Sequence, residues 1–245
     1  MSYLGLVKPI FNSFLKDIPE PKILEIGIDQ GQTLLPMIQN LVARHRKFTY
    51  TAVDILLRDE LAAQLYQLAG VNVVGWDDPG DGNIIIQEAN SLNWLAESDF
   101  PDSFKFDLVL LDGDHNYSTV FKELHLLQKI IRPESIIVCD DFNGRWSETD
   151  LFYIEKEEYR GNQLATPRSE SPKQGVGNAV KDFLIEDPRW SYFDIPPFEP
   201  AVLYRSDIWK KPRLFVTDER HHMRDLVFTM ERQQPKGESS ETDME

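Results

Sequence analysis

The chain has 245 residues, of which 41% are hydrophobic, and this size and composition suit one α/β domain with an ordinary core. Its 26 Lys and Arg residues against 41 Asp and Glu residues give a net charge of −15. Such an acidic balance argues against a nucleic acid or an anionic membrane surface as the main partner. Cations, cationic cofactors and neutral substrates are compatible with it.

Nothing in the sequence indicates a membrane or an exported protein. No apolar run approaches the roughly 18 residues of a membrane span, and the N-terminus lacks the basic start and the cleavage site of a signal peptide. The single cysteine, Cys139, cannot form an internal disulfide, so no oxidising compartment is indicated. These features predict a cytoplasmic protein.

Strand and helix patterns alternate along the chain. Apolar residues at helical spacing in 8–18 predict a lead-in helix within residues 1–19. Short apolar runs that end in turns predict buried strands at 22–28, 47–55, 106–114 and 135–141. Amphipathic patterns predict helices at 33–42, 58–70, 120–131 and 175–187. Thr33 can cap the first of these helices, and Gly70 can cap the end of the second.

Two strand-like segments, 71–76 and 84–89, flank a turn-rich stretch. One of them is expected to be the third core strand and the other a hairpin partner, and the sequence leaves open which is which. Residues 191–196 and 201–206 are expected to close the sheet as a terminal hairpin. We therefore predict an α/β fold with a Rossmann-like doubly wound sheet, mostly parallel with a C-terminal antiparallel hairpin.

One domain is predicted for residues 1–231. Within it, residues 144–175 are polar, charged and irregular, and they are too long for a simple connection, so we expect a lid or insertion there. Its aromatic residues could stack on an acceptor, or the segment could be an ordered surface loop or an oligomer contact. Residues 232–245 are expected to form a disordered acidic tail.

The turn after the first strand, EIGIDQGQT, departs from a dinucleotide fingerprint. From Gly27 onward the fingerprint would need glycine where Asp29 and Gln32 stand. Because an acid repels a pyrophosphate, NAD and FAD are disfavoured and a positively charged nucleoside is favoured. Glu25 could face an ammonium group, and Asp54 could accept hydrogen bonds from both hydroxyls of a ribose. The alternative is a tight strand-to-helix turn with exposed acids.

The motifs ILEIGIDQGQT, AVDI, FDLVLLDGDHNY and IIVCDDF occur in the order found in class I S-adenosylmethionine-dependent methyltransferases, which the chain resembles over residues 20–205. The glycine turn, DGDH.Y and the final DD resemble the branch that contains macrocin O-methyltransferase, related metal-dependent sugar O-methyltransferases and cephalosporin-hydroxylase-like proteins. The resemblance implies S-adenosylmethionine as the cofactor. The predicted cofactor-binding residues are Glu25, Gly27, Asp29, Gly31, Thr33, Asp54, Glu88, Asn90 and Asp112.

Two predicted strands end in acids, Asp112 on one and Asp140 with Asp141 on the other. The strand order that the resemblance implies makes these strands neighbours, so the three carboxylates should converge. Such a group repels itself unless it is protonated or bridged by a cation. Oxygen ligands suit Mg²⁺, Mn²⁺ or Ca²⁺, and the resemblance assigns a metal to these three positions. Asn143 is a further candidate ligand, and Asp140 with Asp141 could instead merely end the strand.

The resemblance implies a metal-assisted O-methyltransferase that acts on a hydroxylated small molecule or glycan. Asp112 and His115 are the predicted catalytic residues, with His115 as the general base, because a neutral imidazole can take a proton near pH 7. His115 could instead be a packed histidine at a strand end. Two alternatives stay open: a cephalosporin-hydroxylase-like metal-dependent enzyme, or a non-catalytic nucleoside-binding module. The branch also suggests self-association into a homo-oligomer.

Overall fold

The computed structural model describes residues 3–44, 47–68, 71–75, 83–101, 103–194, 199–217 and 225–234. Within these residues one sheet has the strand order β3-β4-β2-β1-β5-β6-β8-β7. Its strands are β1 (Lys22–Ile26), β2 (Thr49–Asp54), β3 (Val73–Gly75), β4 (Ile84–Glu88), β5 (Phe106–Leu111), β6 (Ile131–Cys139), β7 (Trp190–Asp194) and β8 (Ala201–Arg205). The helices are α1 (Tyr3–Phe14), α2 (Leu34–Arg44), α3 (Asp59–Gln67), α4 (Ser91–Glu97), α5 (Tyr117–Leu127) and α6 (Val176–Glu186).

The strands from β3 to β6 pair in parallel, and β8 pairs antiparallel with both β6 and β7. This confirms the predicted mixed sheet with a terminal hairpin. A second, two-stranded antiparallel sheet joins β9 (Arg213–Thr217) and β10 (Asp225–Thr229). No helix in the described part of the chain is long and apolar enough to cross a bilayer.

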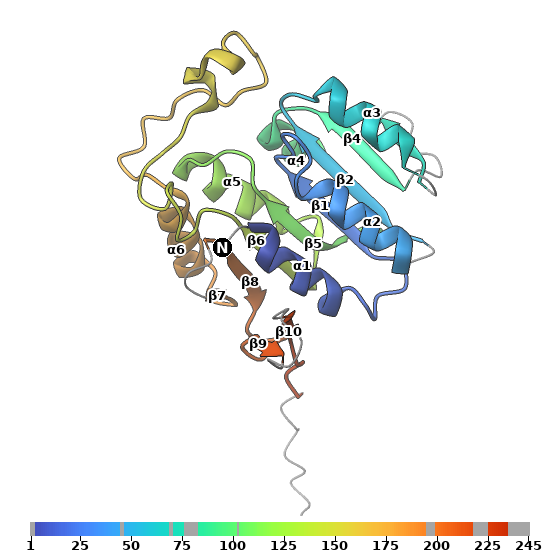
Figure 1. The fold of residues 1–245 in the computed structure, drawn as a ribbon. Helices are drawn as coiled ribbons and strands as arrows, with labels where there is room; N and C mark the ends of the chain where they lie inside the picture. The colour runs from blue at the N-terminus through green and yellow to red at the C-terminus, as the bar shows by residue number, and fades with distance from the viewer. Residues whose placement is uncertain are drawn as a thin grey trace, which may run out of the picture.

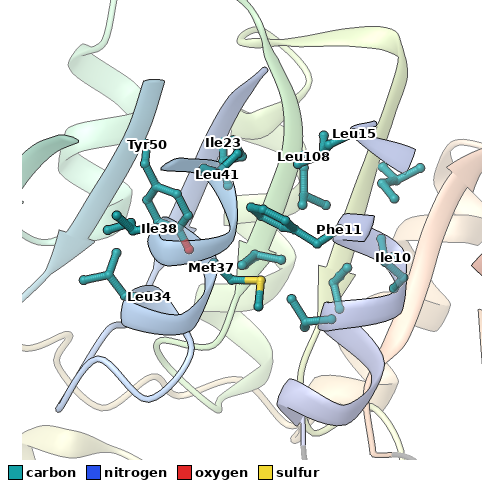
Figure 2. Packing of buried hydrophobic residues seen from close by; sticks show 14 of the residues in the cluster. Ile10, Phe11, Leu15, Ile23, Leu34, Met37, Ile38, Leu41, Tyr50 and Leu108 are labelled. Carbon is teal, nitrogen blue, oxygen red and sulfur yellow. The ribbon is translucent and has the colours of Figure 1, made fainter. Parts of the chain in front are cut away.

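Helices cover both faces of the main sheet (Figure 1). One hydrophobic cluster joins the sheet to α1, α2, α3 and β10, and the other joins it to α4, α5 and α6. In Figure 2, Phe11 of α1 and Met37 and Ile38 of α2 pack over Ile23 and Leu108 of the sheet. Because the sheet is buried on both sides, its strands are continuous apolar runs, and their polar residues gather at the ends.

The structure decides the ambiguity in residues 71–90. β4 is the core strand, because it pairs with β2, whereas β3 is an edge strand. The pairing of β3 with β4 is parallel, so the expected hairpin between them is wrong. The lead-in helix also differs, since α1 ends at Phe14 and the backbone amide of Ile18 donates to the carbonyl of Leu15 in the turn that follows.

Three smaller expectations also need correction or lie outside the described residues. Ile131 begins β6 instead of ending a helix, because the pattern at 120–131 runs across the boundary between two elements. Gly70 lies outside the described residues. So does most of the predicted tail, but Gln233 is held in place, since its backbone amide donates to the carbonyl of Ile208.

Candidate active site

The carboxyl ends of β1, β2, β5 and β6 surround a pocket of about 610 Å³. This position is the one expected for a ligand site on a parallel sheet, and the size suits a small ligand. The pocket is strongly acidic. Its acidic lining residues are Glu25, Asp29, Asp54, Asp112, Asp114, Asp140 and Glu158, and its Arg and Lys residues are Arg58 and Lys156. Such a field favours a cationic ligand over an anionic one.

The glycine turn packs directly on the end of β5. Gly27 has φ +86°, and a Cβ atom there would lie 2.2 Å from the backbone oxygen of Asp112. Only glycine allows both this conformation and this approach. Asp29 also has positive φ, at 39°, and its exposed side chain lines the pocket. The turn therefore brings the backbone of β1 and β5 together under the ligand position.

Asp54 holds this turn from the neighbouring strand. Its Oδ2 atom accepts the backbone amides of Ile28 at 2.7 Å and Asp29 at 3.1 Å, and its Oδ1 atom accepts that of Leu56 at 3.0 Å. A carboxylate has about four acceptor positions, so Asp54 keeps capacity for a ligand hydroxyl. The predicted ribose contact is thus compatible with a residue that also shapes the turn.

Glu25 forms the floor of the pocket and is only 1% exposed. Burial raises the pKa of this carboxyl to about 8, against the lowering effect of a hydrogen bond from Tyr50. In that bond the Tyr50 hydroxyl lies 2.7 Å from Oε2 of Glu25. A cationic group placed beside Glu25 would favour its charged form.

The insertion at 144–175 contributes part of the pocket wall, and in Figure 1 it is the yellow segment above α5 and α6. It is anchored by polar contacts to the loops after β2 and β4. The side-chain amide of Asn162 donates to the carbonyl of Ile55 at 2.9 Å, and that of Asn90 donates to the carbonyl of Leu164 at 2.9 Å. Its residues that line the pocket are Tyr153, Lys156, Glu158, Tyr159 and Thr166, and its role as a lid or insertion stays a prediction.

Asp112 and Asp140 lie side by side at the other end of the pocket and share a hydrogen bond. Burial raises the pKa of both, and that of Asp112 is raised further by the charge of Asp140. A hydrogen bond between two carboxyl groups requires that one of them keeps its proton, so the pair shares a proton. Oδ1 of Asp140 is buried and has no hydrogen-bond partner among the described residues. An orphaned carboxylate oxygen of this kind is one that a bound cation would satisfy.

Asp141 points elsewhere, although it directly follows Asp140. Its Oδ2 atom lies 3.2 Å from Nδ1 of His115, and Oδ1 lies so near Gly144 that a Cβ atom there would be 1.9 Å away. The described residues contain no group of three or more His, Cys, Asp or Glu side chains arranged to hold a metal ion. Asp112 and Asp140 fit a cation, whereas a site formed by all three predicted carboxylates is not confirmed and stays a prediction.

His115 is the residue that links the two strand ends. Its side chain lies 3.2 Å from Asp141 through Nδ1 and 3.9 Å from Asp112 through Nε2, which is too far for a hydrogen bond. Burial lowers the pKa of His115 to about 4, and the charge of Lys156 acts in the same direction. The imidazole is therefore neutral at pH 7. The ring of Tyr153 faces it at a centroid distance of 6.1 Å.

The structure places the predicted residues unequally. Glu25, Gly27, Asp29, Thr33, Asp54, Asp112, His115 and Asp140 line the pocket, whereas Gly31, Glu88, Asn90 and Asp141 do not. Glu88 accepts the backbone amide of Leu57, and Asn90 caps α4. The side chain of Asn143 donates to Asp194 at 3.2 Å. No ligand tests these assignments, so they stay predictions.

Two residues of the site were not foreseen. Tyr50, which contacts Glu25 but does not line the pocket, looks like an ordinary core residue of a strand, and Arg58 looks like an exposed residue at a helix start. Arg58 in fact donates to Asp29 at 2.8 Å and to Glu158 at 2.5 Å. The acidic glycine turn and the arginine at the start of α3 could have suggested the contact between Arg58 and Asp29. No pattern in the sequence indicates the contact between Arg58 and Glu158 of the insertion.

Comparison with known proteins agrees with the fold. Residues 24–142 match the family described as Methyltransferase domain. The structure of CalS11, a calicheamicin methyltransferase, is similar with a TM-score of 0.51 at 14% identity, over 81% of this chain and 77% of that chain. An apo structure of CalS11, described as a TDP-rhamnose 3′-O-methyltransferase, gives a TM-score of 0.50 at the same identity and coverage.

TomG, an O-methyltransferase from Streptomyces achromogenes, is similar with a TM-score of 0.46 at 15% identity, over 82% of this chain and 76% of that chain. No curated protein matches the sequence. At such identities the solved structures bear on the fold, while the family match covers the glycine turn, the end of β2 and both acidic strand ends. Residues 24–142 therefore match a methyltransferase domain, and the fold is the one expected for class I S-adenosylmethionine-dependent methyltransferases.

Proposed function

We propose that the protein transfers a methyl group from S-adenosylmethionine to a hydroxyl oxygen of a small molecule or sugar, with a divalent cation assisting. The observation that carries this proposal is the position of His115. It is a buried, neutral histidine between the acids that end β5 and β6, at the side of the pocket away from Asp54. A transferase to oxygen needs such a proton acceptor beside its cofactor.

The cofactor end of the pocket fits a sulfonium nucleoside. Asp54 can accept from ribose hydroxyls, and Glu25 can accept from the amino group of the methionine portion. The acidic lining favours the positive charge that S-adenosylmethionine carries and that its product loses. Charge thus supports binding of the methyl donor over the demethylated product.

His115 can serve as the base through Nε2. Its Nδ1 atom donates to Asp141, as assigned from the 3.2 Å contact, so the lone pair of Nε2 is free to accept. The acceptor hydroxyl would give its proton to Nε2 while its oxygen attacks the methyl carbon. The carbon–sulfur bond breaks as the carbon–oxygen bond forms, and S-adenosylhomocysteine leaves. Asp141 orients the ring and stabilises the imidazolium that results.

Asp112 and Asp140 would hold the divalent cation, with Asp141 as the third predicted ligand. When bound, such an ion lowers the pKa of a coordinated hydroxyl and fixes two neighbouring oxygens of a diol. The orphaned oxygen of Asp140 supports a cation at this place. Tyr153, which faces His115, would border the acceptor.

Titration calorimetry and a methyl-transfer assay test the proposal. Binding of S-adenosylhomocysteine should survive EDTA, because Asp54 and Glu25 are not among the proposed cation ligands. Turnover of a panel of catechols and sugar diols should require Mg²⁺ and should be lost in Asp140→Asn. Cofactor binding without turnover of any hydroxylated acceptor would favour the non-catalytic binding module, and absence of cofactor binding would overturn the proposal.

A further inference from the structure

Tyr50 is a fully buried tyrosine whose hydroxyl reaches the floor of the pocket. It lies on the face of β2 that α2 covers, and Figure 2 shows its ring beside Leu34 and Ile38. Its hydroxyl donates to Oε2 of Glu25 at 2.7 Å. Burying a hydroxyl in an apolar cluster is unfavourable unless it is hydrogen-bonded, so this contact is the one that satisfies Tyr50.

The contact leaves one oxygen of Glu25 available. None of the described residues donates a hydrogen bond to Oε1 of Glu25. Oε1 is also not counted as a buried atom without a partner, which means that it is not sealed inside the protein. Glu25 lines the pocket, so Oε1 is the atom that a ligand can reach. Because Tyr50 lies in the close-packed core, its ring cannot follow a moving carboxylate. Tyr50 therefore holds the Glu25 carboxylate in one orientation from the core side of the pocket.

We propose that Tyr50 is a positioning residue that aims Oε1 of Glu25 at the amino group of the cofactor and so selects ligands that carry the amino-acid portion. The inference rests on the proposed function, since it requires a nucleoside with a methionine-derived chain in this pocket. Tyr50 does not touch the ligand. It acts through Glu25, which accepts a hydrogen bond from the ligand ammonium.

A pair of ligands separates this role from a general effect on folding. S-adenosylhomocysteine carries the amino-acid portion, whereas 5′-methylthioadenosine has the same adenosine and sulfur without it. Calorimetric titration of both ligands into the full chain measures the ratio of their affinities. In Tyr50→Phe we expect about a tenfold loss for S-adenosylhomocysteine, the order of one hydrogen bond to a charged group, and no change for 5′-methylthioadenosine.

Two further variants keep the test decisive. Tyr204→Phe removes a hydroxyl from the same hydrophobic cluster at a residue that does not line the pocket, and it should leave both affinities unchanged. Glu25→Gln should weaken S-adenosylhomocysteine alone, and adding Tyr50→Phe to it should cause little further loss, because the two residues act as one unit.

Equal weakening of both ligands in Tyr50→Phe, or no weakening of either, would overturn the inference and leave the proposed function standing. If Tyr50→Phe does not fold, equal losses of affinity for the two ligands in Glu25→Gln would overturn it as well. Failure of the unaltered chain to bind S-adenosylhomocysteine would be a different result, since it removes the proposed function itself.

Discussion

Nη2 of Arg58 lies 2.5 Å from Oε1 of Glu158, and this ion pair joins the start of α3 to the insertion. The same guanidinium contacts Asp29 of the glycine turn, so the Arg58 side chain connects the glycine turn to the insertion. Both carboxylates raise the pKa of Arg58.

Glu158→Gln should speed the release of S-adenosylhomocysteine. The pair is partly exposed, so the expected change in the dissociation rate is about two- to fivefold, and it should shrink as salt is added. Stopped-flow displacement measures this rate. Glu155→Gln is a matched control, because Glu155 pairs with Arg168 on the same insertion outside the pocket. An equal effect of both variants would show that the insertion does not act through Arg58.

Asp54→Asn should weaken S-adenosylhomocysteine by at least about tenfold, because an amide cannot accept with both ends as the carboxylate does. Three backbone amides depend on these acceptors, and the ribose of the proposed cofactor would depend on them as well. Glu88→Gln is the comparison variant, since Glu88 holds the amide of Leu57 outside the pocket. We expect it to keep cofactor affinity. A large loss of cofactor affinity in Glu88→Gln would instead show that Glu88 belongs to the cofactor site, as the sequence predicts.

His115→Gln should reduce kcat by about 10²- to 10⁴-fold, the usual contribution of a general base. S-adenosylhomocysteine affinity should not change, because His115 faces the acceptor side. Steady-state kinetics with a diol acceptor, together with calorimetry, separates these quantities. Retained kcat in this variant would mean that another group removes the acceptor proton.

Gly144→Ala should impair catalysis through Asp141. The new Cβ atom would lie 1.9 Å from Oδ1 and 3.0 Å from Cα of Asp141, so the carboxylate must turn away from His115. We expect kcat to fall by at least about tenfold, the order of one lost hydrogen bond to a charged group, without loss of cofactor affinity. Gly75→Ala is the control, because its Cβ atom would meet nothing within 4 Å. Unchanged kcat would show that the contact between Asp141 and His115 is dispensable.

Glu123→Gln should change how stability depends on pH. Glu123 is buried in α5, accepts from Oγ of Ser91 at 2.5 Å, and burial raises its pKa to about 8 from 4.5. Between these values the folded chain keeps a proton that the unfolded chain releases, so the free energy of unfolding falls as the pH rises. Glu123→Gln has no carboxyl group to titrate at this position, so its free energy of unfolding should not show this fall.

Urea denaturation at pH 5 and pH 8 measures the effect. The stability of Glu123→Gln relative to the unaltered chain should rise by more than about 1.4 kcal/mol between the two values, the equivalent of one pKa unit. Glu60→Gln, on the exposed surface of α3, should show no such trend. A parallel fall in both proteins would mean that other groups control the pH dependence.

The main sheet was predictable because each buried strand is a short apolar run that ends in a polar turn. β1, β5 and the hairpin of β7 with β8 follow from that pattern. The edge strand β3 was ambiguous, because Val73, Val74 and Gly75 are too few to show a period. The hairpin of β9 and β10 was missed, since pairing between separated segments is a tertiary property.

The site was predictable where chemistry coincides with a strand end, as at Asp54 and Asp112. The site was not predictable where the direction of a side chain decides whether that side chain reaches the pocket. Asp141 is adjacent to Asp140 in sequence, but its φ of 53° turns the chain and separates the two carboxylates. Tyr153 and Glu158 belong to a segment without hydrophobic periodicity, so only the folded chain shows that they reach the pocket.

The approach of Gly27 to the carbonyl of Asp112 leaves no room for a side chain between the end of β1 and the end of β5. Gly113 extends this close approach, since a Cβ atom there would lie 3.1 Å from the side chain of Ile26. A side chain at Gly27 would therefore push against the backbone of Asp112 and Gly113 as well as strain its own turn. For the proposed function, this means that a substitution at Gly27 would disturb the glycine turn and the acidic end of β5 together, so the two could not be changed independently.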